Sequence, residues 1–341
     1  MAAKMKTIAI TAYKRPQYFE QLLSSLIKND LHDWEIYIQL EPSNKEKYFF
    51  EIAERLLKSY SYFIGVNPYV LGIRDNPYHM LDKVFISGAL CCIYLEEDLI
   101  ISPDVTRIAN WYLRQDHKDV IALNLISGGC NSAGFISNPA EMNTFIKTNR
   151  INSLGLIFTD HQWEQHLKSN WHKKVEHTTS HNGILFEGWD LSLYDYLLSH
   201  SDLHALQPVF SRVIHISEEN TTHTTREFQK KAFMGLGIYE GPPLSEYIIC
   251  NDFYSFPYPL RSHLNLWQEL TEALVLLKKS KKTEAGLEIN LKNKDEEIQQ
   301  LQMQLTEVNY VLEKTCKSKS WRLTFFLRWF NLKYKSILSS F

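Results

Sequence analysis

The stretch Thr7-Ile8-Ala9-Ile10-Thr11-Ala12-Tyr13-Lys14-Arg15-Pro16 decides the class of fold. Its first six residues form an apolar run that predicts a short buried strand. Pro16 stands where the first turn of a helix tolerates proline, and Leu22, Leu23 and Leu26 follow it with helical spacing. The chain therefore opens with a predicted strand, a loop and a helix.

The same alternation continues outward from this unit. Strands are predicted at 34–40, 62–66, 91–95 and 120–125, and helices at 48–57 and 81–90. Such alternation favours an α/β fold with a parallel sheet covered by helices. Ligands of these sheets bind beyond the carboxyl ends of the strands. Farther along, we expect a helix that begins near Asp190 and a strand at 209–216.

The composition is that of a globular protein with little general attraction for nucleic acid. Of 341 residues, 44% are hydrophobic and 22% are charged, which allows a sizeable core. The formal net charge is −2, so we expect no nucleic-acid partner. Five cysteines, two of them adjacent, match neither a disulfide framework nor a CxxC metal site and favour a reducing cytoplasm. We expect neither a signal peptide nor a bilayer-spanning segment.

Three consecutive carboxylates, Glu96, Glu97 and Asp98, follow the predicted strand at 91–95. Like charges repel one another and are costly to hold at the end of a buried strand unless a cation lies beside them. Carboxylate oxygens suit Mg²⁺ or Mn²⁺, and either ion can bind a diphosphate. The triplet therefore indicates a site for a divalent metal, with a solvated acidic turn as the alternative.

Three segments together resemble a known family: residues 10–16, residues 71–78 and residues 96–104. In this order they resemble GT-A fold glycosyltransferases, closest to the family 2-like group related to the N-acetylglucosaminyltransferase that acts on mannosides. Residues 187–190 and 207–216 also have counterparts in that group, so the resemblance covers about residues 5 to 225. It implies a Rossmann-like mixed sheet flanked by helices, and metal-dependent, inverting transfer of a sugar from a nucleotide-sugar donor.

The resemblance also implies roles for individual residues. Asp98 matches the position that ligates the metal, and Glu96 and Glu97 flank it to contact the sugar or the ribose. The loop from Thr11 to Arg15 matches the nucleotide-binding loop, with Arg15 near phosphate. The residues implied in nucleotide-sugar binding are Thr11, Tyr13, Arg15, Glu41, Arg74, Asn76, Glu96 and Glu97.

Several of these residues also have simpler interpretations. The alternatives are that Arg15 caps a turn, that Arg74 pairs with a carboxylate, and that Glu41 is solvated rather than placed against the base. His215 and His223 bracket a polar loop, and in many GT-A enzymes a histidine near this point joins the metal or the diphosphate. For both histidines the alternative is a packed or hydrogen-bonded imidazole.

The general base that such a transfer needs has two candidates, Asp190 and Glu187. Asp190 is favoured because a carboxylate at the start of a helix, beside Trp189, can be positioned and kept available. The alternative is that Asp190 is an ordinary helix N-cap. The mannoside enzymes follow their Trp-Asp pair with a second Asp and an aromatic residue, whereas this chain has Leu191 and Ser192, so Glu187 stays a competitor.

The C-terminal part of the chain has a different pattern. Apolar residues repeat every seven positions, which favours a coiled coil, and hence a homo-oligomer, over a lone surface helix. Lys294 interrupts the second row. The two apolar rows are Leu291, Ile298, Leu305 and Leu312, and Leu287, Leu301 and Val308.

The last segment, residues 317–341, carries six basic residues and no acidic one, which leaves −8 on the rest of the chain. Its basic residues alternate with Trp, Phe and Leu, as in a helix that lies on a membrane surface. The alternatives are nucleic-acid binding and a helix docked on the chain's own catalytic domain. The predicted domains are a glycosyltransferase domain at 1–265, a helical coiled-coil segment at 266–316, and this amphipathic tail.

These patterns predict a hexosyl- or N-acetylhexosaminyl-transferase that uses a nucleotide sugar, most simply a UDP-linked one, and Mn²⁺ or Mg²⁺. We expect the acceptor to be a glycan or a lipid-linked molecule of the cell surface, and the protein to be cytoplasmic, at the inner face of the membrane. One alternative is a nucleotidyltransferase, although residues 11–16 lack the Gly-rich phosphate loop that it needs. The other is a non-catalytic coiled-coil scaffold with a degenerate GT-A domain.

Overall fold

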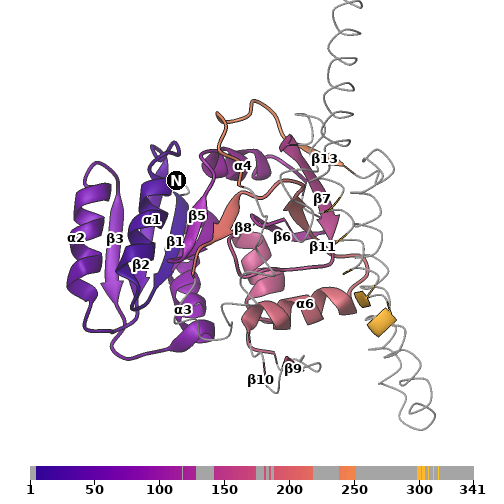
Figure 1. Ribbon diagram of the computed structural model, residues 1–341, viewed down its shortest axis with the longest axis horizontal. Helices are drawn as coiled ribbons and strands as arrows, with labels where there is room; N and C mark the ends of the chain where they lie inside the picture. Colours follow the sequence, from indigo (N-terminus) through magenta and orange to yellow (C-terminus); the bar gives the residue numbers. More distant parts are fainter. Residues whose placement is uncertain are drawn as a thin grey trace, which may run out of the picture. The chain divides into compact units, whose positions relative to one another are not determined.

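A nine-stranded sheet forms the centre of the computed structural model, and the helices cover it on both faces (Figure 1). The chain divides into two units, Met1–Gly128 with Asn143–Ile249, and Gly129–Met142 with Cys250–Phe341. The structure describes residues 5–116, 118–127, 142–173, 180–181, 184–185, 188–217, 238–250, 298–300, 302–303, 306, 310 and 314.

The strand order of the large sheet is β13-β7-β11-β6-β8-β4-β1-β2-β3. The four strands β4, β1, β2 and β3 run parallel, whereas β8 is antiparallel to both β4 and β6. The sheet is therefore mixed. Its strands are β1 (Met5–Ala12), β2 (Trp34–Leu40), β3 (Tyr62–Val66), β4 (Ala89–Glu96), β6 (Val120–Asn124), β7 (Thr144–Thr148), β8 (Leu156–Thr159), β11 (His204–Pro208) and β13 (Ile248–Cys250).

Alternating side chains of the strands enter two different cores. Ile8 and Ile10 of β1 pack with one set of helices, while Ala9 between them packs with the other. This follows from the two-residue period of a strand. The helices of the first core are α1 (Pro16–Leu26), α2 (Glu46–Leu57) and α4 (Val105–Tyr112). Those of the second are α3 (Gly72–Ile86), the π-helix η2 (Trp163–Leu167) and α6 (Trp189–Ser199).

The smaller elements complete the first unit. The short helix α5 (Asp160–Gln162) precedes η2, and β9 (Ser180–His181) pairs with β10 (Ile184–Leu185). A second ribbon joins β5 (Leu99–Ile101) to β12 (Val213–His215) in antiparallel order. This ribbon brings the chain after position 212 back to the acidic triplet.

The α/β class with a mixed sheet and flanking helices, predicted from the sequence, is confirmed. Two predicted elements are misplaced by more than two residues. The helix predicted at 81–90 begins at Gly72 and ends at Ile86, because the apolar residues after it belong to β4. The strand predicted at 209–216 is only β12, because the chain bends after β11, and Pro208 has no N–H to extend that strand as a donor.

The predicted coiled coil and tail lie almost entirely outside the described residues, as do the predicted domain boundaries at 265 and 316. Ile298, on one heptad row, is buried. The described positions off both rows are exposed: Gln299, Gln300, Gln302, Met303, Thr306, Tyr310 and Lys314. Within the described part of the chain, no helix has the length and apolar character needed to cross a membrane.

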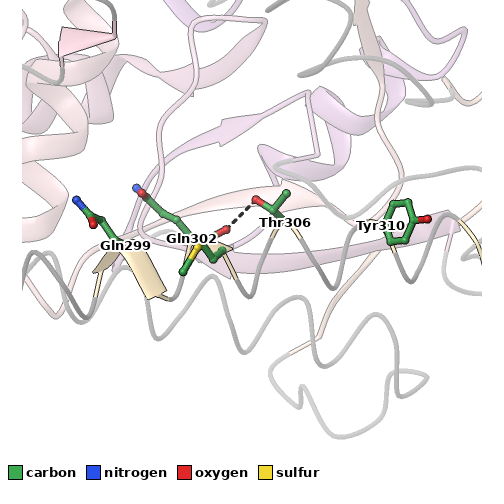
Figure 2. A pocket seen from close by; sticks show the side chains of 5 residues that line it. Gln299, Gln302, Thr306 and Tyr310 are labelled. Atoms are coloured by element: carbon green, nitrogen blue, oxygen red, sulfur yellow. Dashed lines mark hydrogen bonds between the residues drawn. The ribbon is translucent and has the colours of Figure 1, made fainter.

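Figure 2 shows Gln299, Gln302, Thr306 and Tyr310, which line a pocket together with Met303. Thr306 donates a hydrogen bond from Oγ1 to the carbonyl oxygen of Gln302 at 2.8 Å. All of these lining residues lie between positions 299 and 310. The pocket therefore contains none of the residues predicted for sugar transfer.

Candidate functional site

The predicted nucleotide-binding loop and the acidic triplet meet because β1 and β4 are parallel neighbours. Thr11 lies opposite Glu96 in this register, and the backbone N–H of Glu97 donates to the carbonyl oxygen of Thr11 at 3.1 Å. Both strands end at the same edge of the sheet. The loop after β1, which contains Arg15, and the carboxylates after β4 therefore face one another.

Arg15 is the cation that holds this acidic group together. Its Nη2 lies 2.6 Å from Glu97 Oε1 and 2.9 Å from Asp98 Oδ2. Its Nη1 donates to Ser217 Oγ at 2.7 Å. Arg15 also stands at the N-terminal boundary of α1, where its side chain makes no capping hydrogen bond. The guanidinium is thus directed into the acidic site rather than used as a turn cap.

Asp98 is also contacted by His215, from the far end of the β5–β12 ribbon. The imidazole Nε2 donates to Asp98 Oδ2 at 3.0 Å. Burial by itself raises the pKa of Asp98, but the His215 hydrogen bond and the nearby His215 and Arg15 charges outweigh it, and the pKa lies below its usual value. The other oxygen, Oδ1, is buried and accepts no hydrogen bond within the described part of the chain.

Tyr94 is a site residue that the sequence analysis missed. Its hydroxyl donates to Glu96 Oε1 at 3.1 Å and lies 3.1 Å from Thr11 Oγ1. Because the tyrosine proton goes to Glu96, the Thr11 hydroxyl is the donor in the second contact. The sequence contains a signal for this contact. Tyr94 precedes Glu96 by two residues, and alternate residues of a strand share a face.

The crowding of carboxylates changes their titration. Burial, followed by the charges of Asp98 and Glu97, raises the pKa of Glu96 from 4.5 to about 8. Burial and the charge of Asp98 raise the pKa of Glu97 to about 7, although Arg15 opposes the shift. Full ionisation of all three carboxylates is therefore disfavoured, and the site favours an added cation or proton.

This crowding predicts a pH-dependent stability of the metal-free protein. A carboxyl whose pKa is higher in the folded state keeps its proton longer when folded, so the folded state loses stability as pH rises from 4.5 through about 8. The midpoint temperature of unfolding should therefore fall more steeply over this range in the unmodified protein than in Glu96→Gln, which cannot titrate there. Parallel curves for the two proteins would contradict the assignment.

The donor set fits one kind of metal site. No three His, Cys, Asp or Glu side chains of the described chain are arranged to hold a metal ion by themselves. Mg²⁺, however, is usually held by one or two carboxylates together with substrate phosphates. Asp98 offers a buried oxygen that accepts no hydrogen bond from a described residue, and His215 lies beside it. These residues fit a cation that binds together with a diphosphate.

Glu41 contacts the start of α3. Its carboxylate accepts hydrogen bonds from the backbone N–H groups of Leu71, at 3.0 and 3.1 Å, and of Gly72, at 2.9 Å. Gly72 has a φ of +86°, which glycine adopts without strain. Glu41 thus caps the N-terminus of α3 instead of being solvated. Asn67 links it to Asn76 by donating to both side chains.

A second cluster surrounds the start of α6. Arg74 of α3 donates from Nη2 to the carbonyl oxygen of Gly188 at 3.1 Å and to Ser192 Oγ at 3.3 Å. Asp190 lies in the first turn of α6, whose N-cap residue is Gly188. Burial raises the pKa of Asp190, while hydrogen bonds from its own and the next backbone N–H and from Ser153, and the charge of Arg74, oppose the shift.

The structure connects the two clusters through aromatic rings. Tyr94 contacts Trp189, the neighbour of Asp190, edge to face with the ring centroids 5.7 Å apart. Tyr13 lies outside this connection, with Lys14 Nζ 4.3 Å from the centre of its ring. Two predicted site residues, Glu187 and His223, lie outside the described residues.

Comparisons with known proteins give distant structural likenesses. No protein-family model and no curated protein sequence matches the chain. The mannosyltransferase PcManGT from Pyrobaculum calidifontis, solved with GDP-Man and Mn²⁺, is 12% identical with a TM-score of 0.39, over 89% of this chain and 70% of that one. Residues 1–349 of TarS from S. aureus, solved with UDP-GlcNAc, are 14% identical with a TM-score of 0.36, over 87% and 71%.

The glycosyltransferase GlyE of Streptococcus pneumoniae is 14% identical with a TM-score of 0.37, and the match covers 68% of this chain and 60% of GlyE. All three TM-scores lie below 0.5. At these values we base a functional assignment on the side chains of the site and not on the likeness.

Proposed function

We propose that the chain is a metal-dependent, inverting glycosyltransferase that uses a nucleotide-sugar donor. The observation that carries the proposal is Asp98, a buried carboxylate at the end of a central strand, contacted by Arg15 and His215 and left with one oxygen that accepts no hydrogen bond from a described residue. Paired cationic donors beside a carboxylate suit a diphosphate bound through a divalent ion.

The chain's own residues would divide the work. Asp98 and His215 would hold Mn²⁺ or Mg²⁺, and the ion when bound would stabilise the negative charge that develops on the departing diphosphate. Arg15, freed from Glu97 when phosphate arrives, would donate to the phosphate oxygens. Glu96, oriented by the Tyr94 hydroxyl, would accept a hydrogen bond from the sugar or the ribose.

Asp190 would take the proton of the acceptor hydroxyl. It is connected to the donor cluster through Trp189 and Tyr94, and Arg74 lies beside it as a positive charge. Glu187 is the competing base. For the acceptor we propose a cell-surface glycan or a lipid-linked molecule, and for the donor a UDP-linked hexose or N-acetylhexosamine.

The two alternative functions make different use of the same residues. A nucleotidyltransferase needs backbone N–H groups of a Gly-rich loop after β1, and residues 11–16 contain no glycine. A scaffold with a degenerate catalytic domain has no use for a largely buried acidic triplet that favours a cation. The carboxylate cluster therefore favours sugar transfer over both.

Thermal stabilisation by nucleotide sugars tests the proposal. A ligand that binds only the folded state raises its apparent stability, and tighter binding raises it more, so at least one donor in a panel of UDP- and GDP-sugars should raise the unfolding temperature with Mn²⁺ but not with EDTA. The same donor should be hydrolysed slowly only when Mn²⁺ is present. If no donor stabilises the protein and none is hydrolysed, the scaffold interpretation is preferred.

We further propose that the C-terminal segments join copies of the chain and attach them to the inner face of the membrane. Two or more amphipathic tails held by a coiled coil bind a surface with an avidity that one tail lacks. Removal of residues 321–341 should release the protein from anionic liposomes and leave oligomerisation and transfer to a soluble acceptor unchanged. Co-sedimentation and light scattering would measure this.

Substitutions on and off the heptad rows provide a test and a control for the same assay. Leu301→Gln with Leu305→Gln should weaken both self-association and liposome binding. Met303→Gln is the control, because Met303 lies off the apolar rows and is 68% exposed. A protein without the tail that still pellets with anionic lipid would remove the membrane-anchor proposal.

A further inference from the structure

An ion pair with no exposed surface lies next to the β5–β12 ribbon. Arg212 Nε is 3.1 Å from Asp104 Oδ2, and both side chains are 0% exposed. Tyr247 donates to the same oxygen at 3.0 Å, and Ser102 donates to the other carboxylate oxygen at 2.6 Å. The Cζ atom of Arg212 lies over the ring of Tyr239, 4.7 Å from the ring centre. No described contact joins the side chains of these five residues to Asp98, His215 or Arg15.

A buried ion pair contributes little net stability, because the cost of removing two charges from water cancels most of their attraction. Its best-attested role is to specify one register among several that a hydrophobic core would accept. The neighbouring element that needs such specification is the β5–β12 ribbon. Each of its strands has three residues, and an isolated two-stranded ribbon is marginally stable.

The register of this ribbon decides where His215 lies. Val213 pairs with Ile101 and His215 with Leu99, so His215 reaches the end of β5 beside Asp98. A slip of one residue would turn every side chain of β12 to the opposite face and remove the imidazole from Asp98. Arg212 immediately precedes the ribbon and is hydrogen-bonded through its backbone N–H to the carbonyl oxygen of Leu125 at 2.8 Å.

The same pair also holds a second part of the chain. Arg212 precedes residues 218–237, while Tyr239 and Tyr247 follow them, and all three side chains meet at or beside Asp104. Ser217, the last described residue before that gap, accepts the hydrogen bond from Arg15. Both His215 and Ser217 are therefore delivered to the acidic site by a segment anchored at Arg212.

We infer that the Arg212–Asp104 pair positions the site, because it sets the register of β12 and thereby places His215 on Asp98 and Ser217 on Arg15. The placement of His215 and Ser217 does not depend on the proposed function. Only the expected consequence, tighter binding of the metal and the diphosphate, rests on it. Arg212, Asp104 and Tyr247 are positioning residues, since they act through His215 and Ser217.

The test replaces the pair without emptying the core. In Arg212→Met/Asp104→Leu, apolar residues fill the volume, and such replacements of buried pairs are often neutral for stability. Tyr247→Phe is a milder second variant that removes one hydrogen bond to Asp104. Phe49→Leu, a core change on α2, is the control for a general loss of stability. Each change is made with His215 intact and with His215→Ala.

Two readouts are measured on the full chain. Calorimetry gives the affinity for UDP and for GDP with Mn²⁺. Imidazole ¹⁵N signals of labelled protein without ligand report the hydrogen bond of His215, which is identified by its loss in His215→Ala. Changes behind metal ligands typically cost about 10- to 100-fold in metal affinity, so we expect a loss of that size in the double variant and a smaller one in Tyr247→Phe.

The inference is supported if these losses shrink in the His215→Ala background, where only the contribution through Ser217 remains, and if the His215 signal shifts in the same variants but not in Phe49→Leu. Equal losses in both backgrounds, or an unchanged His215 signal, would overturn the inference. If the unmodified protein binds neither UDP nor GDP, the proposed function fails. The His215 signal then decides by itself whether the Arg212–Asp104 pair positions His215. If the double variant does not fold, Tyr247→Phe decides by the same criteria.

Discussion

Asp98→Asn is expected to abolish metal-dependent binding of the nucleotide sugar while the fold survives. The substitution keeps the shape of the side chain and its contact with His215, but it removes the charge that a divalent ion needs. Groups that only support a metal ligand account for about 10- to 100-fold in affinity, so loss of the ligand itself should exceed this range. Calorimetric titration with UDP and Mn²⁺ would measure the effect.

The control is Asp116→Asn, the same chemical change at an exposed carboxylate whose partner is Lys118. It should bind nucleotide and Mn²⁺ like the unmodified protein. Circular dichroism and the unfolding temperature of both variants would verify the fold. Mn²⁺-dependent binding that is unchanged in Asp98→Asn would count decisively against Asp98 as a metal ligand.

Asp190→Asn should lower turnover by about 100-fold or more and leave donor binding intact, because general-base catalysis contributes about 10²- to 10⁴-fold. The amide keeps the hydrogen-bonding capacity that Asp190 uses with Ser153 but cannot accept a proton from the acceptor. Steady-state kinetics with a soluble acceptor, beside calorimetry with the donor alone, would separate the two effects.

Asp195→Asn on the same helix is the matched control and should retain turnover. Removing a negative charge from the first turn of a helix costs about 0.3–1 kcal/mol, so Asp190→Asn should lose little stability. A larger loss of turnover in Glu187→Gln, with Asp190→Asn affecting mainly stability, would assign the base to Glu187 and leave Asp190 a structural residue of α6.

Local patterns were enough to predict the strands of the parallel half of the sheet. β2 and β3 begin and end where their apolar runs do, and β4 differs from its predicted range by two residues at the start and one at the end. The acidic triplet was also recognised from a local pattern, because three consecutive carboxylates directly after a buried strand are unusual. The helix α3 was placed too late, since apolar residues recur from Leu81 to Leu90 across the boundary between α3 and β4.

By itself, therefore, the sequence determined the α/β class and the candidate carboxylates, because both depend on residues that are close together along the chain. The tertiary structure alone decided which partners those carboxylates have. Asp98 meets His215 from 117 residues away, Arg15 meets Ser217 from 202 residues away, and Glu41 caps a helix instead of facing solvent. These contacts depend on strand order and on the register of β12, which a local pattern does not encode.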